Sequence, residues 1–349
     1  MNQKTIAVLF GGCSPEYAVS LASAYSVLCH IDRARFKPLP IGITPEGDWY
    51  AFSGALEKIS TDQWQNSADC TPVAFSPSRS NQNLLFLRPE GAERASIDAA
   101  FPVLHGKNGE DGTLQGMFEL AGIPLVGCGA ACSALCMDKD RAHKLVSAEG
   151  VSVPQSFALN CVSGMESARR AAGRIGYPLF VKPVRAGSSF GVSRVAEQSA
   201  LAEAIQLAFQ FDDTVLLEQA ISGFEVGCAV MGSETLTVGE LDEVELSGGF
   251  FDYTEKYTLK TSALHVPARI PPEKTGQIKQ TAKIIYRALG CSGFARVDVF
   301  YTPEGRIVFN EVNTIPGFTS HSRFPNMMKA AGVSFEDVIT RAIEQAVGA

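Results

Sequence analysis

Long hydrophobic runs are missing from this 349-residue sequence. No apolar stretch reaches the ~18 residues of a membrane span, and the N-terminus enters a strand-like segment rather than a secretion signal. Positive charge is scarce as well: a formal net charge of −7 argues against general nucleic-acid binding, which requires a basic surface. A local basic pocket for one nucleotide is compatible with that balance. We therefore expect a cytoplasmic protein with neither a membrane nor a nucleic-acid partner.

Paired metal-binding motifs are absent too. The nine cysteines are scattered without a CxxC pair, and the five histidines show no ligand spacing with them. Most of the cysteines lie among apolar or small residues, namely Cys13, Cys29, Cys128, Cys132, Cys136 and Cys228. We therefore expect reduced structural thiols and no zinc.

Two phosphate-binding glycine motifs, GxGxxG and GxxxxGK[ST], do not occur either. Residues 6–10 predict a buried strand that Gly11-Gly12 ends. The Ser-Pro-Glu sequence at 14–16 then predicts the N-cap, first position and first-turn acid of a helix ending near residue 29. This order is typical of α/β nucleotide-binding folds, but without GxGxxG it indicates dinucleotide binding only weakly. Stabilisation of the helix dipole alone would explain Glu16.

The chain does contain a segment, residues 294–323, that predicts a β-hairpin followed by a loop rich in glycine and serine. A turn at 303–305 separates two alternating strands. The alternation predicts an apolar face with Val297, Val299, Val308 and Val312, and a polar face with Arg296, Asp298, Glu311 and Asn313. With a four-residue loop at 303–306, Asp298 faces Glu311 and Arg296 faces Asn313.

Carboxylates directly opposite each other repel, so we expect a positive charge between Asp298 and Glu311. Together with the Asn313 carbonyl they form an all-oxygen set, which suits Mg²⁺. Two such ions ~4 Å apart commonly clamp phosphoryl groups. The alternative is a solvated sheet face whose carboxylates meet water.

Two further glycine-rich loops predict ligand contact. Residues 97–104 predict a strand, and HGKNGEDGTLQG follows from His105 into a helix at 114–120, which places a site at the strand's carboxyl edge. Residues 179–181 predict a strand that ends in Lys182. In the loop at 185–191, backbone N–H groups and the hydroxyls of Ser188 and Ser189 can cradle phosphates. The alternative for the first loop is that His105 has a structural role, and the alternative for the second is a mobile surface turn.

The other segments define the order of elements. We expect helices at 137–150 and 271–289, a last helix capped by Ser334, and strands at 215–218, 226–231 and 235–243 in an antiparallel arrangement. Residues 248–261 interleave aromatic with charged residues, as expected of a lid. Residues 44–95 are polar, and we expect them to be irregular.

Six ordered motifs together resemble the D-alanine–D-alanine ligase family of the ATP-grasp superfamily. They are HGKNGEDG, MDKD, VKPVRAGSSFGV, DYTEKY, ARVDVF and FNEVNTIPGFTSHS. Within the family the chain looks most like the D-alanine–D-serine ligases of glycopeptide resistance, the VanG type. The resemblance implies an α/β (in part α+β) ATP-grasp fold with three domains: a Rossmann-like substrate-binding domain at 1–127, a central domain at 128–217 and a catalytic domain at 218–349.

The resemblance also implies an ATP site between the central and C-terminal domains, with contacts to phosphate, adenine and ribose. The phosphate contacts are Lys139, Lys182 and Ser189, the adenine contacts are Glu218 and Ile221, and Glu225 meets the ribose. Asp298, Glu311 and Asn313 match the positions that hold two Mg²⁺, with Mn²⁺ as a substitute. Dimers are common in the family, so a homodimer is implied.

A second set of implied residues acts on the amino-acid substrates. Glu16, Ser188 and Tyr257 match a hydrogen-bonded trio that closes the lid and shapes the first D-alanine site, His105 lies beside that substrate, and Lys256 reaches the transferring phosphate. The carboxylate of D-alanine takes the γ-phosphoryl group of ATP, and the neutral amine of a second D-amino acid attacks the acyl phosphate. Arg296 and a backbone N–H near Gly317 then stabilise the oxyanion. The lid excludes water.

One position departs from the D-alanine pattern. After Ser320-His321-Ser322 the D-alanine ligases usually carry leucine, whereas this chain has Arg323. Ser322 and Arg323 face the second substrate, and an arginine can donate to a D-serine hydroxyl, which gives strong discrimination. The alternative is that Arg323 points to solvent. The EKY sequence at 255–257 argues against the D-lactate ligases. D-Ala–D-Ser synthesis for peptidoglycan is therefore the expected activity, with D-Ala–D-Ala as the alternative.

Two functions of other classes also fit part of the chain. The first 127 residues could form a simple nucleotide-binding module or the scaffold of an NAD oxidoreductase. The missing GxGxxG and the distant carboxylates of the hairpin argue against both. ATP hydrolysis that depends on Mg²⁺ and an added D-amino acid would separate a ligase from a binding module.

Overall fold

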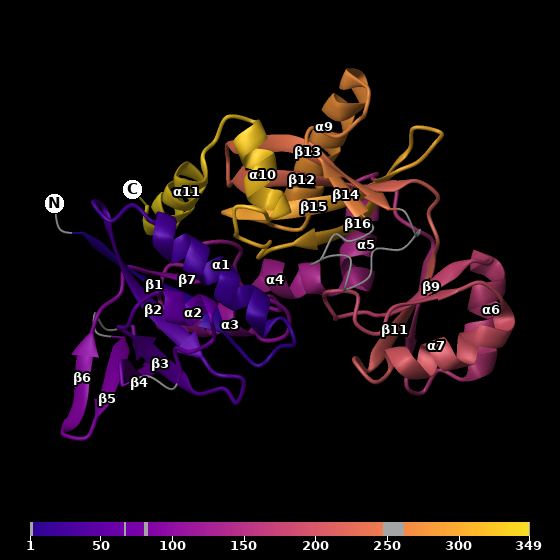
Figure 1. Cartoon of the computed structure of the whole chain (residues 1–349). Coiled ribbons are helices and arrows are strands. Elements are labelled where there is room, and N and C mark those ends of the chain that lie inside the picture. The colour runs from indigo at the N-terminus through magenta and orange to yellow at the C-terminus, as the bar shows by residue number, and fades with distance from the viewer. Residues whose placement is uncertain (1–2, 66–67, 80–82, 247–261, 349) are drawn as a thin grey trace.

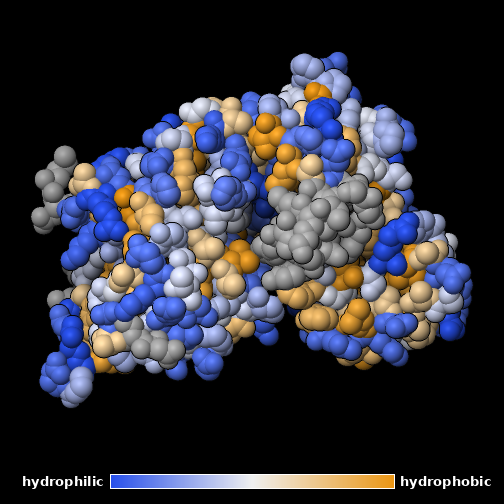
Figure 2. All heavy atoms as spheres, in the orientation of Figure 1, coloured by the Kyte–Doolittle hydropathy of each residue, from blue (hydrophilic) through white to orange (hydrophobic). Residues whose placement is uncertain are grey.

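The computed structural model describes residues 3–65, 68–79, 83–246 and 262–348 (Figure 1). Within these ranges the strands form three sheets in an α/β architecture, as the sequence predicts. No helix in these ranges is long and apolar enough to cross a membrane. Figure 2 shows that hydrophobic residues gather in small groups on the face drawn, among many hydrophilic ones. The expected lid at 248–261 lies outside the described residues, and so do Lys256 and Tyr257.

The first sheet has a parallel centre that is buried on both faces. Its strands are β2 (Phe36–Ile43), β1 (Lys4–Gly11) and β7 (Ala99–Pro102), and the covering helices are α1 (Tyr17–His30) and α3 (Thr113–Ala121). Val8 shares a core with α1, whereas its neighbour Leu9 shares another core with Phe118 of α3. Because both faces are covered, β1 reads as a continuous apolar run.

The expectation that residues 44–95 are irregular is wrong. They form α2 (Glu57–Ser60) and four strands that extend the sheet antiparallel, namely β3 (Trp49–Phe52), β4 (Cys70–Phe75), β5 (Leu84–Arg88) and β6 (Gly91–Ala95). The strands are short, and β6 is almost wholly exposed. A short exposed strand needs no apolar alternation, so the sequence pattern carries little signal there.

The second sheet forms the part of the molecule at the right of Figure 1. Its antiparallel order is β10-β9-β11-β8. The elements are β8 (Ser156–Asn160), α6 (Met165–Ile175), β9 (Leu179–Pro183), β10 (Ser193–Val195), η1 (Gln198–Ala200), α7 (Leu201–Ala208) and β11 (Thr214–Gln219). The apolar faces of α6 and α7 pack on this sheet in a core that contains only residues between 159 and 217.

The third sheet, of order β14-β13-β12-β15-β16, lies between two layers of helices. Its strands are β12 (Phe224–Gly232), β13 (Leu236–Leu246), β14 (Ser262–His265), β15 (Phe294–Tyr301) and β16 (Ile307–Asn313). One face packs on α9 (Pro272–Ala288), α4 (Ala130–Met137) and α5 (Lys139–Ala148). The other face packs on α10 (Arg323–Ala330) and α11 (Phe335–Val347), which share a core with α1 and β1. The Ser334 cap is confirmed, because its hydroxyl accepts from Asp337 N at 3.1 Å.

The hairpin of β15 and β16 has the predicted pairing at its functional end. Asp298 faces Glu311 and Arg296 faces Asn313. The register shifts after Asp298, so that Asn310 has no strand-pairing partner on β15 and Val299 pairs with Phe309. The bulge changes which side chain packs with Val312 in this core: it is Phe309, whereas Val308, predicted on that face, is buried outside this core.

Candidate active site

Two cavities meet at the centre of the molecule. The larger, of about 550 Å³, lies between α1, the loop after β7 and the segment 311–323. The smaller, of about 410 Å³, lies between the second and third sheets. Lys139, Ser188 and Glu311 line both cavities. Ala186 and Gly187 line both as well, so among the described residues these five positions form the boundary between the cavities.

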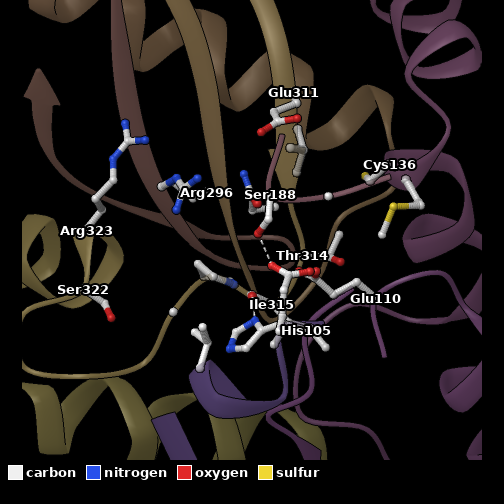
Figure 3. A pocket seen from close by; sticks show the side chains of 18 of the residues that line it. His105, Glu110, Cys136, Ser188, Arg296, Glu311, Thr314, Ile315, Ser322 and Arg323 are labelled. Atoms are coloured by element: carbon white, nitrogen blue, oxygen red, sulfur yellow. Dashed lines mark hydrogen bonds between the residues drawn. The ribbon is translucent and has the colours of Figure 1, made fainter. Parts of the chain in front are cut away.

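The larger cavity brings together residues that are far apart in the chain (Figure 3). The Ser188 hydroxyl donates to Glu16, which immediately precedes α1. Ser188 and Ser189 both have left-handed backbone angles, with φ of 48° and 60°. Such angles are strained for serine and occur most often at functional loops. The predicted helix start needs a small correction: Ser14 accepts from Glu16 N at 3.1 Å, but regular helix begins only at Tyr17.

His105 lies in the floor of this cavity and is held on both sides. Its Nδ1 is 3.0 Å from the Ile315 carbonyl, and its Nε2 is 3.4 Å from the Ser23 hydroxyl. Burial lowers the pKa of His105 although Glu16 opposes the effect, so the ring is neutral at pH 7. We infer that Nδ1–H donates to Ile315, which fixes the imidazole orientation.

Glu110 is a partly buried acid of the larger cavity that the sequence did not single out. Its Oε2 accepts from Gly106 N at 2.8 Å. Burial, followed by the negative charge of Glu16, raises the pKa of Glu110 to about 8. The available signal was its place in HGKNGEDG, two acids among three glycines.

The smaller cavity contains two buried lysines that point at its wall of carboxylates. Lys182 Nζ lies 2.6 Å from Glu218 Oε1, and Lys139 Nζ lies 3.7 Å from Glu311 Oε2. Lys139 also donates to the Ala186 carbonyl at 2.8 Å. The predicted adenine and ribose residues, Ile221 and Glu225, line the same cavity, as does Ser189. The placement suits a polyanion that contacts both lysines.

His143 supports this wall and was missed by sequence reasoning. It lies one helical turn after Lys139 on α5, and its Nε2 is 2.9 Å from the Asn310 carbonyl. Its Nδ1 lies 3.9 Å from Glu218 Oε2, and neither atom has a hydrogen-bond partner in the described part of the chain. Burial lowers the pKa of His143. The i, i+4 spacing from Lys139 was the only signal.

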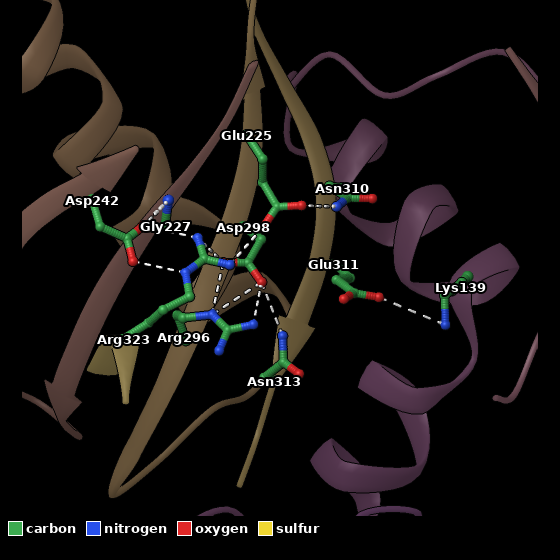
Figure 4. A network of polar contacts seen from close by, with 10 residues as sticks. All are labelled: Lys139, Glu225, Gly227, Asp242, Arg296, Asp298, Asn310, Glu311, Asn313 and Arg323. Atoms are coloured by element: carbon green, nitrogen blue, oxygen red, sulfur yellow. Dashed lines mark hydrogen bonds and ion pairs between the residues drawn. The ribbon is translucent and has the colours of Figure 1, made fainter. Parts of the chain in front are cut away.

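A buried ion-pair network joins the hairpin of β15 and β16 to Arg323 at the start of α10 (Figure 4). Arg296 binds both oxygens of Asp298, with Nε 2.8 Å from Oδ1 and Nη2 2.7 Å from Oδ2. Asn313 Nδ2 donates to Asp298 Oδ2 at 3.0 Å. The expected positive charge between the carboxylates is thus supplied by Arg296 at Asp298 and by Lys139 at Glu311.

Arg323 is the second cation of this network, and the alternative that it points to solvent is wrong. Its Nε and Nη2 bind Asp242 at 2.7 and 2.8 Å, and its Nη1 lies 2.6 Å from Glu225 Oε1. Burial raises the pKa of Asp242, but the charge and hydrogen bonds of Arg323 outweigh burial and lower it. Gly227 makes room for the pair, since a Cβ there would lie 2.5 Å from Asp242 Oδ1 and 2.6 Å from Arg323 Nη2.

Asp298, Glu311 and Asn313 fit the divalent cations that the sequence predicts. All three offer oxygen atoms on one face of β15 and β16, next to both cavities. Burial raises the pKa of Asp298 despite Arg296, so this carboxylate gains from added positive charge. Hard oxygen ligands of this kind suit Mg²⁺ or Mn²⁺.

Gly317 and Ser322 complete the larger cavity. Ser322 Oγ accepts from Thr319 N at 3.0 Å, and a Cβ at Gly317 would lie 2.8 Å from that oxygen. The structure therefore brings together at two adjoining cavities all the predicted site residues that it describes. Asp298 lies just behind the cavity walls, bonded to Arg296 and Asn313.

Comparison with known proteins gives the same answer along the whole chain. Residues 5–128 match the family described as "D-ala D-ala ligase N-terminus", and residues 145–344 match "D-ala D-ala ligase C-terminus". The VanG D-Ala:D-Ser ligase from Enterococcus faecalis is 55% identical, with a TM-score of 0.93 and coverage of 99% of this chain and 100% of that one.

Two curated relatives extend the comparison. The vancomycin B-type resistance protein VanB of Enterococcus faecalis is 46% identical, covering 99% of this chain and 100% of its own. D-alanine–D-alanine ligase A of Escherichia coli K12 is 38% identical, covering 99% and 96%. With both family regions matched and the ATP-grasp fold in place, this chain belongs to the D-alanine–D-alanine ligase family.

Proposed function

We propose that this enzyme joins D-alanine to D-serine with the hydrolysis of ATP to ADP and phosphate. The observation that carries the ligase mechanism is the junction of the two cavities at Lys139, Ser188 and Glu311. A nucleotide in the smaller cavity presents its terminal phosphate to an amino acid in the larger one. The 55% identity to a VanG D-Ala:D-Ser ligase favours D-serine as the second substrate.

The nucleotide is held by charge and shape. Lys139 and Lys182 pair with the phosphates, which replace their present partners Glu311 and Glu218. Ser189 and the loop backbone complete the cradle, while Ile221 and Glu225 meet adenine and ribose. Mg²⁺ bound by Asp298, Glu311 and Asn313 would neutralise phosphate charge. Lys256 and Tyr257 keep their proposed roles at the lid, outside the described residues.

The amino acids are held in the larger cavity. Glu16, fixed by Ser188, takes the ammonium group of the first D-alanine, whose carboxylate receives the γ-phosphoryl group. The neutral amine of the second substrate attacks the acyl carbon, and phosphate leaves. Arg296 and the backbone near Gly317 stabilise the tetrahedral oxyanion. His105, neutral and fixed by Ile315, shapes the first site without adding charge.

Arg323 is proposed to contact the D-serine hydroxyl as a donor that Asp242 holds in place. It lines the larger cavity beside Ser322, and its side chain has no freedom to leave the wall. A fixed donor that D-alanine leaves unpaired discriminates against D-alanine. The runner-up is D-Ala–D-Ala synthesis, since D-alanine–D-alanine ligases are among the relatives.

A competition assay tests the proposal. The enzyme receives ATP, Mg²⁺ and equal concentrations of D-alanine and D-serine, and the dipeptides are resolved by mass. Mostly D-Ala–D-Ser is expected. Mostly D-Ala–D-Ala would make it a ligase of ordinary peptidoglycan synthesis, and phosphate release without either dipeptide would refute both substrates. A role in glycopeptide resistance, a cytoplasmic location and a homodimer follow as parts of this proposal.

A further inference from the structure

Four buried thiols lie close together where α4 leads into Lys139. The sequence had suggested structural cysteines without contact to one another. Cys128 precedes α4, Cys132 and Cys136 lie on successive turns of α4, and Cys291 follows α9. Their exposed fractions are 4%, 6%, 5% and 8%. No ligand spacing is visible in the sequence because Cys291 lies 159 residues after Cys132.

The sulfur atoms are already at distances that a metal site requires. Cys132 Sγ lies 3.8 Å from Cys136 Sγ and 3.5 Å from Cys291 Sγ. The sulfurs of Cys128, Cys132 and Cys291 all lie within 4.8 Å of one another. A tetrahedral site with Zn–S bonds of about 2.3 Å has sulfurs about 3.8 Å apart. Three sulfurs are thus close enough to share one ion with little movement, and Cys136, close to Cys132, is the candidate for the fourth position.

We propose that Cys128, Cys132 and Cys291, with Cys136 as a fourth ligand, bind one thiophilic d¹⁰ cation, Zn²⁺ or Cu⁺. Thiolate ligands select these soft ions over Mg²⁺, so the site does not compete with the hairpin carboxylates. The surrounding core is apolar, so a cation that offsets the thiolate charge is favoured over isolated thiolates. Binding releases the thiol protons to solvent, and no electrons are transferred.

The site has an entrance and a structural consequence. Cys136 lines the larger cavity (Figure 3), so the thiol cluster borders the active site. α4 leads directly into Lys139, and Cys291 leads into β15, which carries Arg296 and Asp298. A bound ion would tie these two segments together and hold the phosphate-binding lysine in register with the hairpin.

Metal titration of the reduced full-length enzyme tests the proposal. We expect one equivalent of Zn²⁺ or Cu⁺ to bind and to raise the melting temperature, and Co²⁺ in its place to show sulfur-to-metal charge-transfer bands. Replacing exposed Cys13, Cys29 and Cys161 with serine removes competing thiols and should leave binding unchanged. Zinc and copper titrated separately identify which ion the site prefers.

Single substitutions in the core make the test decisive. Cys132→Ala and Cys291→Ala should each weaken binding by at least about 10- to 100-fold, since even outer partners of a metal matter that much. Cys228→Ala is the matched control, because Cys228 is buried in the same apolar core but is not part of the thiol cluster. Tight binding retained in folded Cys132→Ala and Cys291→Ala enzymes would overturn the proposal. Absence of binding by either ion to the wild type would overturn it as well.

Discussion

At the scale of single residues, Arg323 has two partners that shape any experiment on it. Removing its guanidinium leaves Asp242 buried without its ion-pair partner and deprives Glu225 of an ion pair. A change in substrate preference must therefore be separated from a loss of stability.

Arg323→Leu should shift the products toward D-Ala–D-Ala and destabilise the fold by about 3–5 kcal/mol, because it breaks a buried ion pair. Adding Asp242→Asn should recover part of the stability, since the amide oxygen still accepts from Gly227 N–H. The ratio of dipeptides by mass, and urea unfolding, measure the two effects. An unchanged ratio in both variants would refute the role of Arg323 in D-serine selection.

Glu110 gives a pH dependence with a definite sign. Its pKa is raised from 4.5 to about 8 in the folded protein, so the folded state holds the proton more tightly than the unfolded chain. Its contribution to stability is therefore complete below pH 4.5 and is lost as the pH rises toward 8. Glu110→Gln mimics the neutral acid, keeps an acceptor for Gly106 N–H and should lack this loss. Urea unfolding of both proteins from pH 5 to about pH 8 tests this, and parallel stability curves would contradict it.

At the scale of elements, the sequence predicted best where a pattern is local. The antiparallel strands β12 and β13, the helix α9 and the pairing of Asp298 with Glu311 follow from alternation and caps. The bulge at Asn310 could not be predicted, because two hairpin lengths satisfy the same alternation near the turn. The contact between Glu16 and Ser188 was implied by the family resemblance alone, because it depends on how separate sheets pack, which no local pattern records.

Glycines within elements provide a paired test of packing. Gly227→Ala in β12 should destabilise by about 1–3 kcal/mol, because its Cβ would overlap the Asp242–Arg323 pair. Gly173→Ala in α6, where a Cβ meets nothing within 4 Å, should stabilise by about 0.5–1 kcal/mol. Thermal unfolding of the two variants measures both. Equal effects would mean that helix propensity and local space do not explain these positions.

At the scale of the whole molecule, one apolar core joins the first sheet to the helices after the third. Phe318 lies at its centre, 1% exposed, with its ring 5.9 Å from Phe101, 5.0 Å from Phe294 and 5.8 Å from Phe324. The second sheet, of order β10-β9-β11-β8, has a separate core of its own. The three domains predicted at 1–127, 128–217 and 218–349 remain a prediction, and α4 and α5 pack with the third sheet.

Phe318→Ala should destabilise by about 3–5 kcal/mol through a cavity in this shared core. Because this core joins the first sheet to the helices after the third sheet, hydrogen exchange should accelerate in β1 and α10 together. Val162→Ala is the control, since that side chain is 85% exposed and should change stability by less than about 0.5 kcal/mol. Faster exchange confined to α10 would show that the two parts do not share one cooperative unit.

The separate core of the second sheet has a consequence for turnover. That sheet is joined to the rest of the chain near residues 149–155 and 219–223, and it supplies one wall of the smaller cavity through Phe180 and Lys182. The core of this sheet contains only residues between 159 and 217, so rotation about these connections would leave that core intact. α1 and the 311–323 segment form walls of the larger cavity, and these two segments meet in the shared core. We therefore expect ADP to leave by swinging of the second sheet, a movement that would also part Ser188 from Glu16 and open one wall of the larger cavity.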